Sequence, residues 1–422
     1  MPDAPPLLTS QQAFQILDSI PLNPRIESMP LESAQGRRLA ADLTADRDYP
    51  PFDKSQMDGI AIRHEDLSSN LHLIGEIPAG SWPTRPLSPG QAIRIMTGAP
   101  LPPGADTVIP VEHITATADH CQVLKPFKKH NAISPQGAEV RAGQIVLHAG
   151  TILNPPQLAV AATIGAAQVP VYAPPRIAIL TTGDEVVHYS QSPAPAQIRN
   201  SNSLLLSSML WNLNCDITDL GIAPDHPDTL RDYLTEGLSY DVLFITGGMS
   251  MGNYDYVPTL LQQLGVTLQI SKVKIKPGKP FLFGKFSGFS FPGSAKIKAP
   301  SSPSSLNPEP LNPDHSCLVF GLPGNPVSAF VCTTLFATRI ISRLTGGSPH
   351  PRTSTHTLTT PLPPNGPREF FQPVLLQNNS ATPLPWKGSS DLFTLAQANA
   401  LLSRPENAPP LPAGSSVEVI EI

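Results

Sequence analysis

An alternation of short apolar runs and helical segments between residues 176 and 344 constrains the fold of this 422-residue chain more than any other feature. The apolar run at residues 177–180, and residues 241–245, which are apolar after Asp241, predict buried strands. Helices are expected over residues 201–213, 225–238, 258–264 and 325–344, with further strands near residues 267–275. Strands that alternate with helices predict an α/β domain with a doubly wound, mostly parallel sheet and helices on both faces.

The remaining segments have other patterns. Thr9 or Ser10 can cap a short helix, and residues 155–165 are again helical in character. Between them, short apolar runs bounded by glycine and proline pairs predict a loop-rich β domain, inserted into a helical one. We therefore expect a helical arm or linker domain (1–48 and 142–174), an inserted β domain (49–141), the α/β domain (175–347) and a small C-terminal β domain (348–422).

Proline is unusually abundant, at 51 of 422 residues. Proline and glycine together make up 80 of 422 residues, below the share of about a quarter at which low complexity becomes the default. We therefore expect a folded protein with proline-stiffened loops. Residues 287–316, rich in proline and serine, are expected to be a disordered insert in the α/β domain.

Net charge and the placement of the cysteines indicate which kinds of ligand and which cellular compartment fit this chain. The formal net charge is −5 and there is no dense basic run, so we expect no nucleic-acid surface and favour small-molecule chemistry. The four cysteines form no Cys-x-x-Cys motif, which fits packing residues in a reducing compartment. The start has no secretory pattern, and prolines interrupt the most apolar stretch, 158–180, so we expect no membrane span and a cytoplasmic location.

Two carboxylates follow the first strand of the α/β domain. Asp184 and Glu185 come shortly after residues 177–180, at the carboxyl end of a parallel strand, where doubly wound folds bind ligands. They can hold a metal or act as a base. An ordinary turn with a solvated acidic pair is equally compatible with the pattern.

A glycine-rich turn follows the second strand. Gly247, Gly248 and Gly252 allow backbone N–H groups to approach an oxyanion, and the Ser250 hydroxyl adds a donor. The pattern lacks the Gly-Lys-Ser/Thr of a phosphate-binding P-loop, and a purely structural turn is the alternative.

Two further turns suit an anion. Lys276 and Lys279 flank a stiff Pro-Gly pair, and lysines bind anions as point charges. In residues 321–328, Asn325 can cap a helix and Ser328 offers a hydroxyl near free N–H groups, although a plain helix cap is the alternative. Three anion-binding elements and one acidic element at the strand ends of one sheet predict a phosphate-like ligand with a divalent ion.

The β domain contributes weaker candidates. Residues 52–59 place Asp53 and Asp58 in one short loop, and Thr97 offers a hydroxyl at a tight turn. The sequence contains no His-Glu-x-x-His and its eleven histidines are dispersed, so a zinc hydrolase or a serine esterase has no support.

Seven motifs follow one another along the chain: FDKSQMDG (52–59), RIMTGAPLPPGAD (94–106), TGDE (182–185), QIRNSN (197–202), GGMSMGNYD (247–255), KPGKP (276–280) and LPGNPVS (322–328). With these motifs the chain resembles the molybdopterin molybdenumtransferase family, which includes the E domain of gephyrin. The likeness covers nearly the whole chain in order.

The resemblance implies an enzyme that inserts molybdate into adenylylated molybdopterin with Mg²⁺ present, releasing AMP and molybdenum cofactor. It implies an elongated homodimer, and a contact with the upstream adenylyltransferase would fit such a pathway. By this resemblance, the molybdate and phosphate oxygens are bound by Ser250, Lys276, Lys279, Ser328 and Arg368, and Asn325 shapes the loop. Mg²⁺ is held by Asp184, Glu185 and Asp255. Asp58 and Thr97 of the other subunit complete the cleft.

Some positions depart from the family pattern. Lys54 and Ile60 replace an uncharged residue and an aromatic one, Ser134 and Ala138 replace an arginine and a glycine, and Pro373 replaces a second arginine after Arg368. Two other functions fit parts of the chain: the adenylyltransferase that makes the adenylylated intermediate, which would lack the β domains, and a gephyrin-like scaffold without catalysis.

Overall fold

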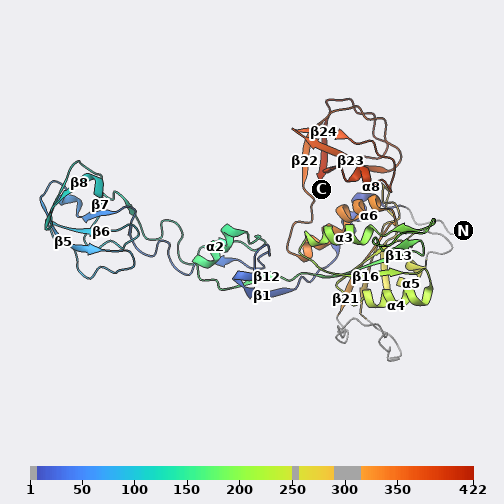
Figure 1. Ribbon diagram of the computed structural model, residues 1–422, viewed down its shortest axis with the longest axis horizontal. Coiled ribbons are helices and arrows are strands. Elements are labelled where there is room, and N and C mark those ends of the chain that lie inside the picture. The colour runs from blue at the N-terminus through green and yellow to red at the C-terminus, as the bar shows by residue number, and fades with distance from the viewer. Residues whose placement is uncertain (1–6, 250–255, 289–314) are drawn as a thin grey trace. The chain divides into compact units, whose positions relative to one another are not determined.

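The computed structural model describes residues 7–249, 256–288 and 315–422 (Figure 1). The chain divides into two compact units, one of residues Met1–Glu27 and Tyr172–Ile422 and the other of residues Ser28–Val171. The two passages between the units lie in β1 (Ile26–Pro30) and β12 (Gln168–Tyr172), which pair with each other.

A six-stranded sheet organises the first unit. Its strand order is β16 (Asp216–Ala223), β13 (Arg176–Thr182), β17 (Val242–Thr246), β21 (Ser316–Leu322), β20 (Leu282–Ser287) and β18 (Val266–Ile270). The first four strands are parallel, and β20 and β18 add antiparallel pairings. The mostly parallel sheet predicted from the sequence is therefore confirmed.

Successive residues of each central strand face opposite sides of the sheet. In β13, Ile177 packs in one core and Ala178 in the other, as the two-residue period of a strand requires. Helices cover both faces, as predicted. One face is covered by α1 (Ser10–Ser19), α3 (Asn202–Trp211) and the helix α6 (Pro326–Cys332), η4 (Thr333–Ala337) and α7 (Thr338–Leu344); the other is covered by α4 (Pro227–Gly237) and α5 (Val257–Gln263) (Figure 1).

The helix from α6 to α7 is the central core helix of this unit. By length and composition Pro326–Leu344 could cross a membrane, but 72% of its most apolar stretch is buried inside the protein. A buried core helix has the same length and composition, so this segment is weak support for a membrane span. The four cysteines are free and buried, as predicted, and burial raises the pKa of the Cys215 thiol to about 12.

Helix α1 differs from the domain expectation. Thr9 caps it with a capping box to Gln12, as the sequence suggested. It packs on α7 in the first unit, however, where Asp18 accepts two hydrogen bonds from Arg339 at 2.6 and 2.8 Å. Residues 7–27 thus lie in the same compact unit as the α/β domain, because the apolar face of α1, with Ala13 and Leu17, completes the α/β core.

Two strands of the sheet were not predicted. Strand β16 is half-buried at the sheet edge, so its residues lack an unbroken apolar run. Strand β20 precedes the predicted insert and pairs with β21, with Ser287 opposite Ser316. The predicted insert bounds of 287 and 316 therefore fall within strands, and residues 289–314 lie outside the described part of the chain.

The C-terminal part of this unit is a small barrel. Strands β23 (Glu369–Gln377), β24 (Ser380–Pro383), β22 (Thr353–Leu358), β26 (Ser416–Glu421) and β25 (Ala400–Arg404) form a closed ring, because β25 also pairs with β23. Val374, Leu402 and Val419 fill its interior. Strand β19 (Ile275–Lys276) comes from the α/β part and pairs with β23, so the barrel edge carries the lysine turn. Helix α8 (Leu392–Leu395) lies in the loop between β24 and β25.

The second unit contains a six-stranded sheet. Its order is β7 (Thr107–Pro110), β4 (Gly59–Ile62), β6 (Gln91–Ile95), β5 (Leu71–Ile77), β9 (His120–Val123) and β8 (Ile114–Ala116). Gly59 is required at the start of β4, because a Cβ there would lie 1.9 Å from the Ile109 carbonyl oxygen. Short pairs flank this sheet: β3 (Lys54–Ser55) with β10 (Ile133–Ser134), and β2 (Leu43–Thr44) with β11 (Ile145–Leu147). Helix α2 (Pro155–Thr163) forms near the predicted position.

Candidate functional site

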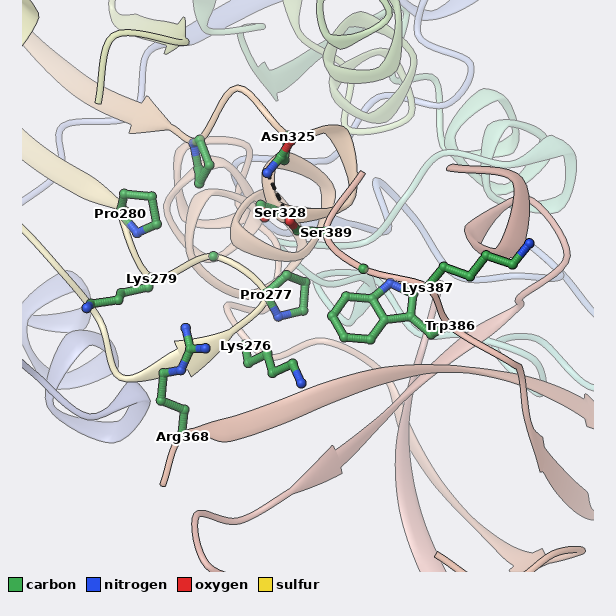
Figure 2. Close-up of a pocket in the computed structure, with 13 residues that line it drawn as sticks. Lys276, Pro277, Lys279, Pro280, Asn325, Ser328, Arg368, Trp386, Lys387 and Ser389 are labelled. Carbon is green, nitrogen blue, oxygen red and sulfur yellow. Dashed lines mark hydrogen bonds between the residues drawn. The ribbon is translucent and has the colours of Figure 1, made fainter. Parts of the chain in front are cut away.

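A cavity of about 430 Å³ in the first unit collects most of the predicted anion-binding residues (Figure 2). Three segments line it: the turn after β19, the start of α6, and residues of the C-terminal barrel and its following loop. The lining residues are Lys276, Pro277, Gly278, Lys279, Pro280, Pro323, Asn325, Ser328, Arg368, Trp386, Lys387, Gly388 and Ser389.

The lysine turn is packed tightly against α6. Gly278 has φ +113, and a Cβ there would lie 2.6 Å from the Cys332 Sγ. Only glycine fits this position without displacing the helix. The turn therefore presents Lys276 and Lys279 at the cavity from a backbone that the core supports.

The start of α6 is joined to the loop of the C-terminal part. The Asn325 Nδ2 donates to the Ser389 Oγ at 2.9 Å, and the Val327 N–H donates to the Ser389 carbonyl at 3.1 Å. Asn325 occupies the N-cap position but makes no side-chain capping bond, contrary to the predicted cap. Its amide instead shapes the loop that closes the cavity, while the Ser328 side chain is buried at the same helix start.

The charge of the cavity lining is positive. Lys276, Lys279 and Arg368 line it together, and the described lining residues include no carboxylate. Lys387 also lies at the rim, but Figure 2 shows its side chain pointing away from the other cations. Lysine charges, a guanidinium and a hydroxyl suit a tetrahedral oxyanion.

Sequence reasoning missed Trp386, Lys387 and Ser389. Asp391 holds this segment, because it accepts from the Lys387 N–H at 3.0 Å and from the Thr394 hydroxyl at 2.7 Å. The Thr394 hydroxyl and the Lys387 N–H keep the pKa of Asp391 below its usual value. The Lys-Gly-Ser sequence at 387–389 was an available signal, since a lysine beside a glycine also occurs in the basic turn at 276–280.

The glycine-rich turn lies next to this site. Gly247 and Gly248 both have positive φ, and a Cβ on Gly247 would lie 2.4 Å from the Thr182 carbonyl oxygen. A Cβ on Gly324 would contact the Gly247 Cα at 3.7 Å, so the two loops are neighbours. Neither Gly247 nor Gly248 lines the cavity. Ser250, Gly252 and Asp255 lie outside the described residues.

The predicted metal carboxylates are exposed at the end of β13 and do not line the cavity. The Asp184 Oδ1 accepts from the Asp225 N–H at 3.0 Å. The described residues contain no group of three His, Cys, Asp or Glu side chains that could hold a metal. Mg²⁺ commonly uses only one or two carboxylates and completes its shell with water and substrate phosphate, so the pair of Asp184 and Glu185 is compatible with it.

In the second unit, Asp58 and Thr97 are in contact. The Asp58 Oδ1 accepts from both the N–H and the hydroxyl of Thr97, each at 2.7 Å. These two bonds lower the pKa of Asp58, so an exposed carboxylate is held ionised.

Comparisons with known proteins agree along the whole chain. Residues 8–165 match the family model for the MoeA N-terminal region (domain I and II), residues 178–343 that for a probable molybdopterin binding domain, and residues 355–422 that for the MoeA C-terminal region (domain IV). A molybdopterin molybdenumtransferase from Synechocystis is 30% identical over 92% of this chain and 93% of its own length, and one from Bacillus subtilis is 31% identical over 94% and 90%. The chain belongs to the molybdopterin molybdenumtransferase family.

The solved structures support the same assignment. The molybdopterin biosynthesis moea protein from Pyrococcus horikosii has a TM-score of 0.82 to this chain, with 27% identity and 99% coverage of both chains. A further sequence relative, the molybdopterin molybdenumtransferase from a Nostoc strain, is 34% identical over 81% of this chain and 72% of its own length. The solved structure thus supports the fold, and the sequence relatives support the family.

Three departures from the molybdenumtransferase pattern lie at described positions. Pro373 is buried in β23 and does not line the cavity. Lys54 forms an ion pair with Glu139 at 3.4 Å. Ser134 is buried in β10, the strand that pairs with the strand of Lys54.

Proposed function

We propose that this protein inserts molybdate into the dithiolene of adenylylated molybdopterin, with release of AMP and molybdenum cofactor. The observation that carries the proposal is the cavity lined by Lys276, Lys279, Arg368 and the buried Ser328, with no carboxylate among the described lining residues. Molybdate is a tetrahedral dianion, and this lining supplies positive charge and hydrogen-bond donors to its oxygens.

The chain's own residues bind and orient the oxyanion. Arg368 offers a planar fork of donors, while Lys276 and Lys279 act as point charges and the Ser328 hydroxyl as a further donor. The same cations can take up the phosphate of the departing AMP. Asn325 maintains the wall through its bond to Ser389.

Mg²⁺ belongs to the proposal as well. Asp184, Glu185 and Asp255 would hold it; when bound, the ion neutralises charge on the phosphoanhydride that is cleaved. Gly247, Gly248, Ser250 and Gly252 would supply donors to the phosphate.

A homodimer completes the proposed assembly, with Asp58 and Thr97 closing the cleft from the partner subunit. Helix α3 supports this state, because Leu204 (60% exposed) and Trp211 (75% exposed) lie on one helical face, seven residues apart. Replacing Trp211 with glutamate should yield a monomer by light scattering, whereas a Gln262→Glu control on the exposed side of α5, away from this face, should stay dimeric. A Trp211→Glu variant that stays dimeric would exclude this face.

The test of the function is direct. Purified protein with adenylylated molybdopterin, molybdate and Mg²⁺ should release AMP and activate an apo-molybdoenzyme. Lys279→Gln should abolish both readouts while thermal melting stays unchanged, because Lys279 is an exposed side chain on a supported turn. Wild-type protein that releases no AMP would refute the proposal.

Two further assays distinguish this function from the two alternatives, an adenylyltransferase and a scaffold. ATP-dependent adenylylation of molybdopterin would indicate the upstream adenylyltransferase, and full complementation by Lys279→Ala in a cofactor-deficient host would favour a scaffold. We place the enzyme in the cytoplasm, in contact with the upstream adenylyltransferase, with finer domain boundaries at residues 49, 141 and 347.

A further inference from the structure

Two aromatic side chains at the cavity have no role in the proposed function. Trp386 lines the cavity, and Phe370 lies in β23 directly opposite Lys276 of β19. The Lys276 Nζ is 5.0 Å from the Phe370 ring centroid and 5.3 Å from that of Trp386. The two rings are themselves 5.1 Å apart, with an interplanar angle of 39°.

This geometry falls within the range of a cation–π interaction, which requires the ammonium within about 6 Å of a ring centroid. Lysine otherwise has four flexible side-chain torsions, and confining it costs entropy. Figure 2 shows the Lys276 side chain extending toward the Trp386 ring. The two rings thus restrict the exposed Lys276 ammonium at the cavity wall.

The strand register explains why the cluster forms. Lys276 and Phe370 are partners in the parallel pair of β19 and β23, so the backbone brings them together whether or not a ligand is bound. Trp386 reaches the same ammonium from the loop that Asp391 and Ser389 hold in place.

We propose that Phe370 and Trp386 are positioning residues, an aromatic clamp that holds the Lys276 ammonium ready for an oxyanion. The clamp deepens the proposed function, since it rests on the same cavity and on molybdate as its ligand. It acts through Lys276 and contributes to affinity for the oxyanion rather than to bond cleavage.

The indole nitrogen of Trp386 provides a matched pair of variants. Its Nε1 is buried and has no hydrogen-bond partner among the described residues. Trp386→Phe therefore keeps an aromatic face, although a smaller one, and breaks no side-chain hydrogen bond, whereas Trp386→Leu loses the aromatic face.

Molybdate alone, titrated into the full-length protein by calorimetry, tests the clamp. Trp386→Leu should weaken binding about 3- to 10-fold, as expected for loss of a cation–π contact, and Trp386→Phe should recover most of that loss. Phe370→Leu should weaken binding in the same direction and serves as the second probe if Trp386→Leu does not fold. Equal affinity of the wild type and the folded leucine variants would overturn the proposal.

A double-mutant cycle distinguishes the clamp from general packing. On a Lys276→Gln background, Trp386→Leu should weaken molybdate binding less than about 2-fold, because its effect passes through the ammonium. The same loss on both backgrounds would assign Trp386 a purely structural role and refute the clamp.

Steady-state kinetics keep the two proposals apart. Trp386→Leu should raise the KM for molybdate with little change in kcat. A wild type that binds molybdate and shows the cycle but releases no AMP would refute the proposed function and leave the clamp intact. An active wild type whose leucine variants have unchanged KM would refute the clamp alone.

Discussion

Gly278 shows how a single residue shapes the cavity. Its φ is +113, and a Cβ on this residue would lie only 2.6 Å from the Cys332 Sγ, which leaves no room for a side chain. Gly247 is constrained in the same way by the Thr182 carbonyl. Both glycines stood in motifs that the sequence singled out, but the contacts that make them necessary come from distant segments.

Replacing Gly278 with alanine should destabilise the first unit by about 1–3 kcal/mol, through backbone strain and a clash with α6. Urea unfolding would measure the change. Gly366→Ala is the control, because a Cβ there meets nothing within 4 Å. Adding Cys332→Ala should recover part of the Gly278→Ala loss, and no recovery would mean that the Sγ contact is unimportant.

The bond between Thr97 and Asp58 predicts a titration change. Two donors from Thr97 lower the folded-state pKa of Asp58. The contact therefore stabilises the fold at pH values above the unfolded-state pKa. This stabilisation is lost as the pH falls through the folded-state pKa. Thr97→Val removes the hydroxyl donor and should raise the pKa of Asp58. Carboxyl NMR titration would detect the shift, and Thr97→Ser should titrate like the wild type.

At the scale of elements, α1 depends on α7 for its place in the first unit. The Asp18 carboxylate accepts two bonds from Arg339, which is only 7% exposed and also lies over the Phe14 ring. The helix and its cap were predictable from residues 9–17, because capping is local. Its partner was not, since 321 residues separate Asp18 from Arg339 along the chain.

Asp18→Asn should therefore destabilise the protein by about 1–3 kcal/mol at neutral pH, because a buried guanidinium loses its counter-charge. The hydrogen bond from Arg339 lowers the pKa of Asp18, so the difference from the wild type should be full above about pH 4 and shrink as the pH falls through the folded value. Thermal melts across pH would show this, with the exposed Asp216→Asn as the control. A difference that persists unchanged in acid would contradict the assignment.

At the scale of the whole molecule, β21 joins two places that lie apart, its pairing with the end of β20 and the loop at the cavity. Ser287 and Ser316 are strand partners at one end of β21, and Leu322 at its other end leads into the cavity loop. Seven residues of strand span about 23 Å. The segment between the two strands therefore begins and ends far from the anion site.

Deleting residues 289–314 and joining the strands through an Asn-Gly turn should leave both the sheet and molybdate affinity unchanged, because an antiparallel pair needs only a two-residue loop. Calorimetry and a thermal melt would compare the shortened protein with the wild type. A longer deletion that also removes the paired strand residues Ser287 and Ser316 should destabilise the sheet. Loss of molybdate binding in the first deletion would assign the segment a role at the site.

The sequence alone determined the elements whose signals are local. Apolar strand runs, capping residues and the Lys-Pro-Gly-Lys and Leu-Pro-Gly-Asn turns predicted the parallel sheet, its two helical layers and the cations Lys276 and Lys279. The edge strand β16 escaped this reasoning, because a half-buried strand has no unbroken apolar run.

Only the tertiary structure decided what meets across the chain. The pairing of β19 with β23 brings Lys276 to Phe370, and the bond from Asn325 to Ser389 brings Trp386 to the same cavity. Tertiary packing also places α1 against the α/β core. Such contacts join segments far apart along the chain, so no local propensity records them, and strand register and packing of the closed barrel set them instead.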